Sequence, residues 1–193
     1  MAKYYVRTFL PWILLAVVSG VDDLAGALTG LVAAAVLLGD DLRRGHRGDA
    51  LFLEISTCAF MALLTALAFT VPGSPALDYG ASLAIGWLAL TAWATLAAGR
   101  PFTEGVARRQ VSEAVARTGL FRTINRVLTA VWAGSFTVLA VALGCVQHWA
   151  PHDTALLVAC KIAGFAVPAV VTARYPDSAR RRASKAVAGG VPR

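Results

Sequence analysis

Four ionisable side chains lie in or beside long apolar stretches, where a charge needs a partner or water. Glu54 stands near the start of the third stretch, Asp22 and Asp23 lie between the first two, and Lys161 is inside the last one. Burial favours the neutral form of a carboxyl group, which lets it exchange protons near neutral pH. If the protein is an enzyme, we therefore expect Glu54, Asp22 or Asp23 to be its acid or base.

Depth along the helices decides which of these charges can meet. At a rise of 1.5 Å per residue, Lys161 lies roughly 10 Å from the start of its stretch, on the side of Asp22 and Asp23. Glu54 enters from the opposite side, about half of a ~30 Å hydrocarbon core away. We therefore predict a polar binding cluster in which Lys161 pairs with Asp22 or Asp23. The alternative is that Lys161 extends to the surface and the aspartates cap the second helix, while Glu54 reaches water or a loop arginine.

The motifs of metal and nucleophile chemistry are incomplete in this sequence. The aspartate pairs at 22–23 and 40–41 each lack the further acid, one turn on, that binding magnesium and a diphosphate needs. His148 and His152 have ligand-like spacing, but Pro151 interrupts the helix that would align them. No nucleophile elbow or phosphate-binding loop is present. We expect no metal ion and no cofactor.

Six apolar stretches supply the elements that carry these groups. The 193-residue chain is 58% hydrophobic with a mean hydropathy of +0.65, and a membrane span takes about 20 such residues. We therefore predict an all-α, polytopic membrane helical bundle of six transmembrane segments. The first segment could instead be a cleaved signal peptide, but its cleavage site is loose and we favour a retained helix. The segments run over residues 7–20, 24–38, 51–69, 81–98, 124–145 and 154–173.

The basic residues are sorted onto alternate loops. Apart from Lys161, the 18 lysines and arginines precede or begin the first segment, follow the second or the sixth, or lie between the end of the fourth segment and the first turn of the fifth. The pieces around 21–23, 71–80 and 146–153 hold none. Because basic loops stay in the cytoplasm, both termini are predicted to be cytoplasmic and the protein to lie in the cell inner (plasma) membrane. We expect the arginines to face anionic lipid head groups, and no basic stripe with interleaved aromatic residues indicates nucleic acid.

Two segments outside the spans have a distinct character. Residues 103–118 combine arginines with a weakly apolar helical face, which predicts an amphipathic helix on the cytoplasmic membrane surface. An ordinary solvated loop helix is the alternative. Residues 1–176 are expected to form one bundle, and the basic tail of residues 177–193 is expected to be disordered.

Small and polar residues also line up on two helical faces. Small residues at every fourth position from Gly26 to Ala34 let another backbone approach closely, either within the chain or in a homodimer. Asn125, Thr129 and Trp132 share a face of the fifth segment, where they can bind a ligand or hold helices together. Helix packing is the favoured interpretation of both faces.

The order of elements from Phe9 to Arg174 resembles the intracellular septation protein A family of small, multi-pass bacterial inner-membrane proteins. The residues that carry the resemblance are Phe9-Leu10-Pro11, the small-residue stretch from Ala25 to Ala34, the segment from Phe121 to Arg126 followed by Trp132, and the segment from Lys161 to Gly164. The segment 103–118 and the tail after Asp177 depart from that pattern. The resemblance implies a role in the cell envelope or division, with protein partners, and it supplies no catalytic residues.

The favoured hypothesis is therefore a non-enzymatic protein that acts in envelope maintenance or division. One alternative is a membrane-embedded enzyme that uses its carboxylates for acid–base chemistry on a lipid or isoprenoid substrate, as a cyclase or isomerase would. The other is a proton-coupled small-solute transporter, which needs a polar path from Asp22 past Lys161 to Glu54.

Overall fold

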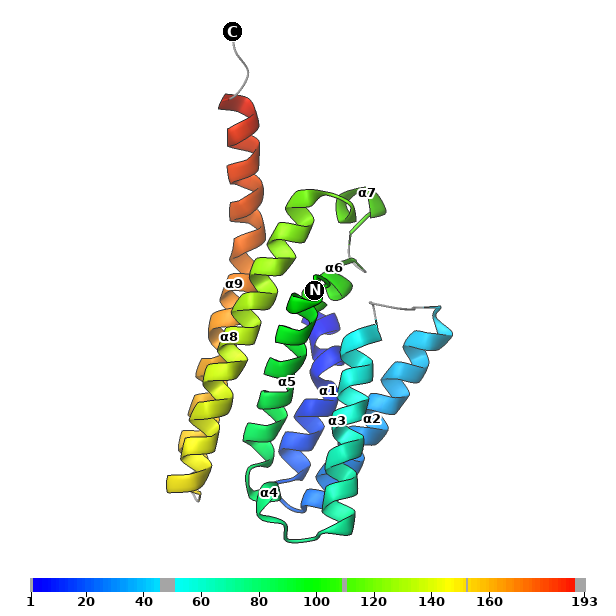
Figure 1. The fold of residues 1–193 in the computed structure, drawn as a ribbon, viewed down its shortest axis with the longest axis vertical. Coiled ribbons are helices and arrows are strands. Elements are labelled where there is room, and N and C mark those ends of the chain that lie inside the picture. The colour runs from blue at the N-terminus through cyan, green and yellow to red at the C-terminus, as the bar shows by residue number, and fades with distance from the viewer. Residues whose placement is uncertain (1, 46–50, 109–110, 152, 190–193) are drawn as a thin grey trace.

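Helices form every regular element that the structure, a computed structural model, describes (Figure 1). The described residues are 2–45, 51–108, 111–151 and 153–189. The helices are α1 (Ala2–Val18), α2 (Asp23–Arg43), α3 (Phe52–Thr70), α4 (Pro75–Asp78), α5 (Gly80–Ala97), α6 (Phe102–Arg108), α7 (Glu113–Ala116), α8 (Gly119–Trp149) and α9 (Thr154–Gly189). The predicted all-α class is therefore confirmed.

Side-chain caps and turn glycines account for where the long helices begin and end. Asp22 Oδ1 accepts a hydrogen bond of 2.6 Å from the Ala25 amide at the start of α2. Thr118 Oγ1 accepts one of 3.2 Å from the Phe121 amide at the start of α8. Each cap satisfies an amide that has no partner inside its own helix. After α5 the chain turns at Gly99, whose φ of +71° favours a residue without a Cβ atom.

Five helices are long and apolar enough to cross a membrane. They are α2, α3, α5, α8 and the Thr154–Arg182 part of α9, while the apolar part of α1, Arg7–Val18, is shorter. Many of their large apolar side chains point away from the bundle, and Val32 and Val138 are 60% and 71% exposed. Exposed apolar surface on this scale is compatible with a multi-pass membrane protein whose outer surface contacts lipid.

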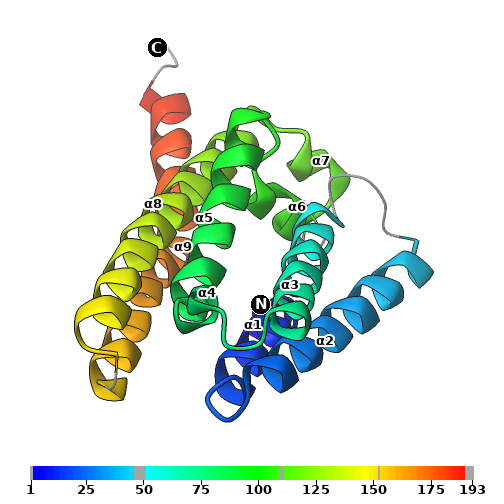
Figure 2. The same cartoon turned by 60° about the horizontal axis from the view of Figure 1, so that its bottom comes forward.

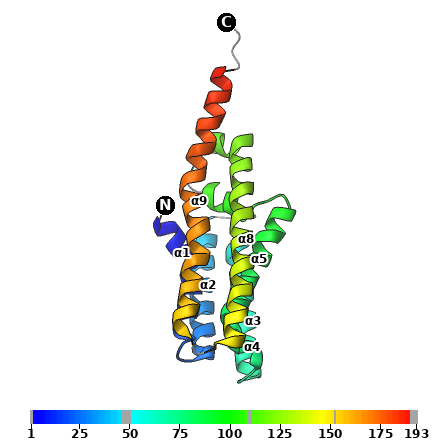
Figure 3. The same cartoon turned by 90° about the vertical axis from the view of Figure 1, so that its left-hand side faces the viewer.

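The long helices pack as two groups of three, α1 with α2 and α3, and α5 with α8 and α9 (Figures 2 and 3). Aromatic side chains join the groups in the core. Phe9 of α1 stacks on Trp132 of α8 with ring centroids 6.0 Å apart, and its ring edge meets Phe165 of α9 at 6.1 Å. Phe60 of α3 lies 5.6 Å from Trp87 of α5. These contacts fix how the two groups face each other.

The small-residue face of α2 packs inside the chain, as the favoured interpretation predicted. Gly26, Gly30 and Ala34 are all buried. A Cβ atom at Gly26 would lie 2.6 Å from the Ser19 backbone nitrogen, and one at Gly30 would lie 2.8 Å from the Met61 sulfur. Since α1 and α3 cover this face, it is not exposed for a homodimer contact.

Residues 103–118 do not form the single helix that the sequence predicted. The described part holds two short helices, α6 and α7, and buries Thr103, Val106 and Ala116. The Thr103 hydroxyl bonds to the Asn125 carbonyl and the Thr129 hydroxyl of α8, so the start of α6 packs against the bundle.

The tail also differs from its prediction, because α9 continues as a helix to Gly189. Figure 1 shows its C-terminal part projecting beyond the other helices. Pro168 and Pro176 lie inside α9 without ending it. The last four residues, 190–193, lie outside the described part of the chain.

Candidate functional site

The two ends of the bundle differ in charge. We call the end where α2 finishes and α8 begins the arginine-rich end, which is uppermost in Figure 1; its described basic side chains include Arg7, Arg43, Arg44, Arg100, Arg108, Arg117, Arg122 and Arg126. We call the opposite end, with the turns after α1, α3 and α8, the aspartate end; it carries Asp22, Asp23, Asp78 and Asp153. The described residues of those three turns include no lysine or arginine.

At the arginine-rich end, one guanidinium joins the first helix to the end of the second. Arg7 Nη1 donates to Asp41 Oδ1 at 2.9 Å, and Arg7 Nη2 donates to Asp40 Oδ2 at 2.6 Å. The Asp41 side chain is 2% exposed, whereas that of Asp40 is 38% exposed and also accepts from Arg44. A buried carboxylate of this kind is stable only with its cationic and hydrogen-bonding partners in place.

Glu54 lines a small cavity together with Arg7 and Asp41, and we call Arg7, Asp40, Asp41 and Glu54 the charged cluster. The cavity measures about 20 Å³, enough for one water molecule. A water held between two carboxylates and a guanidinium could pass a proton. The sequence suggests only an incomplete metal site at the 40–41 pair and does not predict the ion pair of these aspartates with Arg7 of α1. The sequence feature that could have indicated this ion pair is Arg7, a cation at the start of the first apolar stretch.

The predicted ion pair between Lys161 and the aspartates is absent from the structure. No hydrogen bond or salt bridge in the described part of the chain joins Lys161 to Asp22 or Asp23. Asp22 caps α2 instead, which is the alternative interpretation of that residue. The physical reason is helix placement, because α9 packs along α8 whereas the aspartates lie in the turn between α1 and α2.

The helical face that carries Asn125, Thr129 and Trp132 holds helices together, but not through the Asn125 side chain. The side-chain amide of Asn125 donates to the Phe121 carbonyl of the same helix at 2.8 Å, whereas its backbone carbonyl accepts from Thr103 Oγ1 of α6 at 2.9 Å. Thr103 Oγ1 also lies 2.8 Å from Thr129 Oγ1, and Trp132 Nε1 donates to Thr172 of α9 at 3.0 Å. The hydroxyl and indole bonds therefore bind α6 and α9 to α8, while the Asn125 amide is satisfied within α8.

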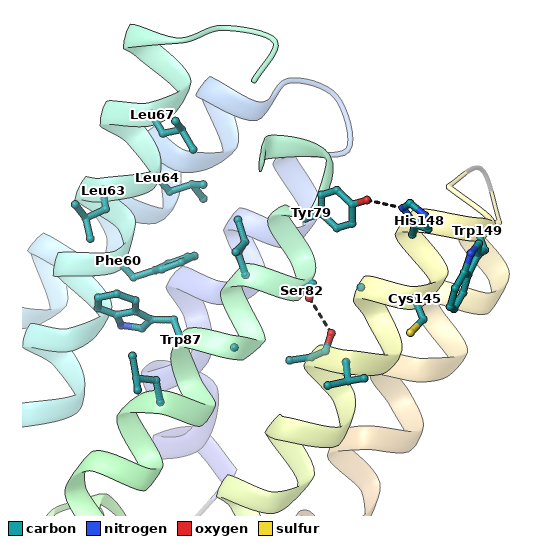
Figure 4. A pocket seen from close by; sticks show the side chains of 16 residues that line it. Phe60, Leu63, Leu64, Leu67, Tyr79, Ser82, Trp87, Cys145, His148 and Trp149 are labelled. Atoms are coloured by element: carbon teal, nitrogen blue, oxygen red, sulfur yellow. Dashed lines mark hydrogen bonds between the residues drawn. The ribbon is translucent and has the colours of Figure 1, made fainter. Parts of the chain in front are cut away.

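A lateral groove of 810 Å³ opens between α3, α5 and α8, and it was not foreseen from the sequence (Figure 4). Apolar side chains line most of it, among them Phe60, Leu64 and Trp87. Its rim is exposed, with Leu63 at 59% and Val141 at 63%. A groove of this size and polarity is typical of sites that bind a hydrophobic ligand.

Polar groups gather where the groove meets the aspartate end. Tyr79 Oη and His148 Nδ1 are 2.9 Å apart, linking α8 to the residue that precedes α5 (Figure 4). Gln147 Oε1 accepts from the Ser82 amide at 3.1 Å, and its Nε2 donates to the Asp78 carbonyl at 2.6 Å. Sequence reasoning did not pair these residues, because they come from segments about 65 positions apart.

The histidine pair considered as a metal site can be followed only in part. His148 bonds to Tyr79, while His152 lies outside the described residues. Among the residues that the structure describes, no three histidine, cysteine, aspartate or glutamate side chains gather as metal ligands would.

No family model, curated protein or solved structure matches the chain. The resemblance to septation proteins therefore remains a hypothesis, and the geometry of the charged cluster and the lateral groove has to carry the functional argument.

Proposed function

We propose that this chain is an integral inner-membrane protein of a bacterium, with six spans and both termini in the cytoplasm. The arginines of the described loops gather at one end of the bundle, which supports this orientation because basic loops stay on the cytoplasmic side. The apolar part of α1, Arg7–Val18, extends about 18 Å, so a span by this helix requires local thinning of the ~30 Å core of the bilayer. The exposed arginines then lie against the anionic head groups of the inner leaflet.

Cysteine labelling tests this topology. In a variant with alanine at the three native cysteines, Val21→Cys places a thiol at the aspartate end, where the native valine is 92% exposed. Ser112→Cys places one beside α7 at the arginine-rich end. A membrane-impermeant maleimide should label the Val21→Cys protein in intact spheroplasts and the Ser112→Cys protein only after permeabilisation. The reverse result would overturn the orientation, and loss of the protein from the membrane fraction would overturn the membrane assignment.

Within that membrane, we infer a non-enzymatic role in envelope maintenance or division, exerted by binding a hydrophobic component in the bilayer. The lateral groove is the observation that carries this proposal, because it is apolar and is built from three helices. Among the described residues no carboxylate lines the groove, and elsewhere in the bundle Asp22 caps α2 and Asp41 is bonded to Arg7. The family resemblance points to the same kind of role.

Complementation tests the role of the groove. A strain lacking the gene should show altered cell length or envelope sensitivity, and the wild-type chain should restore both. Gly86→Leu fills the groove without a clash, because a Cβ atom at this position meets only Ala140 at 3.9 Å. This variant should restore neither the cell length nor the envelope resistance. Val138→Leu, a matched change at a 71% exposed position of α8, should complement. Equal complementation by both variants would contradict a role for the groove.

The enzyme hypothesis has one observation in its favour, the water-sized cavity that brings Glu54 to Arg7 and Asp41. Glu54→Gln keeps the shape of the side chain but removes its acid–base chemistry. A folded Glu54→Gln protein that complements fully would support the non-enzymatic role. A folded protein that fails to complement, beside an active Glu113→Gln control, would favour the enzyme.

A further inference from the structure

We propose that the lateral groove binds one acyl chain of a zwitterionic phospholipid whose head group carries a primary amine, with that head group at the aspartate end. This deepens the proposed function and depends on its membrane location, though not on which end is cytoplasmic. Four features of the groove lead to this ligand.

The first feature is size. A helix about 10 Å across fills about 420 Å³ per 5.4 Å turn, so a groove of 810 Å³ holds only about two turns. A partner helix that crosses the bilayer needs about 20 residues, or more than five turns. An acyl chain is one methylene wide, so it can lie lengthwise in the same space.

The second feature is the shape of the floor. Gly86 of α5 and Gly144 of α8 both line the groove and present no side chain to it. A Cβ atom at Gly86 would find only Ala140 within 4 Å, at 3.9 Å, so the space beside it is open. Phe60 and Trp87 close the deeper end, and the Trp87 ring is held there by hydrogen bonds of its Nε1 to Ser56.

The third feature is a built polar rim. Apolar burial alone cannot choose a lipid here, since the surrounding bilayer is equally apolar. Tyr79 and His148 meet at 2.9 Å on the rim, and the His148 ring lies edge-on to Trp149 (Figure 4). Trp149 is 77% exposed, and its indole N–H makes no hydrogen bond within the described residues. Indole and phenol groups are typical of the membrane interface, where they can donate to a lipid phosphate.

The fourth feature is charge. Asp78 is exposed, directly precedes Tyr79 and makes no salt bridge in the described part of the chain. Asp22, Asp23 and Asp153 add negative charge to the same end, whose described turns hold no basic residue. An anionic head group is repelled there, whereas an ammonium group can pair with Asp78 while the phosphate meets the rim donors. Charge complementarity therefore selects the amine-bearing, zwitterionic lipid.

Native mass spectrometry of the purified full-length chain tests the assignment. Micelles would be doped with dioleoyl phosphatidylethanolamine, phosphatidylcholine or phosphatidylglycerol, which share their chains and differ in their heads. We expect one retained phosphatidylethanolamine, held at least about tenfold more strongly than phosphatidylglycerol. Asp78→Lys should move the preference to phosphatidylglycerol. Retention of phosphatidylcholine equal to that of phosphatidylethanolamine would overturn recognition of the amine.

Groove-filling variants test where the lipid lies. Gly86→Leu and, as a second choice if that protein does not fold, Cys145→Phe should lose the retained lipid, while Val138→Leu should keep it. Unchanged lipid retention in a folded groove variant would overturn the site. The site would also be overturned if the wild-type protein were a dimer and only the groove variants were monomers, because the groove would then be occupied by a second copy of the chain. Lipid retention is measured separately from topology and from complementation. A groove variant that loses the lipid but still complements would therefore refute the envelope role and leave the lipid site intact.

Discussion

Arg7 Nη1 lies 2.9 Å from Asp41 Oδ1, so the start of α1 is tied to the end of α2 by an ion pair whose acidic side chain is 2% exposed. The two residues are 34 positions apart, and the contact closes the helical hairpin at the arginine-rich end. At the other end of the same hairpin, Gly26 of α2 presses against Ser19. The first two helices are therefore fixed to each other at both ends.

Breaking this ion pair should destabilise the protein strongly. Arg7→Met removes the guanidinium and leaves a buried carboxylate that has lost this cation. We expect a loss of about 3 kcal/mol in the free energy of unfolding, at the lower end of the range for broken buried pairs because Arg7 is partly exposed. Denaturant unfolding in detergent, followed by tryptophan fluorescence, measures it. Arg44→Met should cost no more than about 0.5 kcal/mol, since this arginine is 64% exposed.

Replacing both partners should recover most of the loss. An apolar pair of similar volume avoids the cost of burying a lone charge, so Arg7→Met with Asp41→Leu should be more stable than Arg7→Met alone. If the double variant were less stable than either single variant, the cluster would have to contribute more than this ion pair.

The packing of α2 predicts opposite effects for two glycines of the same helix. Gly26→Ala places a Cβ atom 2.6 Å from the Ser19 nitrogen, so α2 must shift and the melting temperature should fall. Gly39→Ala meets nothing within 4 Å and should stabilise the helix by about 0.5–1 kcal/mol. Thermal unfolding of the two purified variants compares them, and a Gly26→Ala protein as stable as the wild type would contradict the close approach.

The contact of α6 with α8 predicts coupling between two threonines. Thr103→Val leaves the buried Thr129 hydroxyl without its partner and should cost about 1–3 kcal/mol. Thr129→Val should cost a similar amount, and the double variant should cost less than the sum. Thr123→Val, at an exposed position of α8, is the matched control and should change little. Additive losses in the unfolding free energy would show that the hydroxyls do not interact.

The absence of a Lys161 ion pair also has a measurable consequence. Asp22→Ala removes the cap of α2 and should cost about 1 kcal/mol. Because Lys161 makes no contact with that aspartate, the cost should be the same in a Lys161→Met background, within about 0.5 kcal/mol. A coupling energy above about 1 kcal/mol between Asp22 and Lys161 would show that the two residues interact, as the sequence predicted.

The sequence by itself determined the apolar parts of the long helices and how they are separated, but not the helical tail of α9 or the break between α6 and α7. Long apolar runs bounded by Gly, Pro and Asp placed α2, α3, α5 and α8 to within about one turn. The exceptions are the C-terminal end of α2 and both ends of α8, where the helices are longer than predicted. Hydropathy and helix breaking act between near neighbours, so they can be read along the chain. For the same reason, Asp22 was recognisable as a cap, since its partner is only three residues away.

The tertiary structure alone decided which side chains meet. Arg7 bonds to Asp41, Tyr79 lies next to His148, and the lateral groove is lined by residues of three helices from different parts of the chain. The predicted pair of Lys161 with Asp22 or Asp23 does not form among the described residues, because depth along a helix says nothing about the rotation of that helix or about its neighbours. Those are set by packing over the whole core, as at the aromatic contact of Phe9 with Trp132, and no local pattern encodes them.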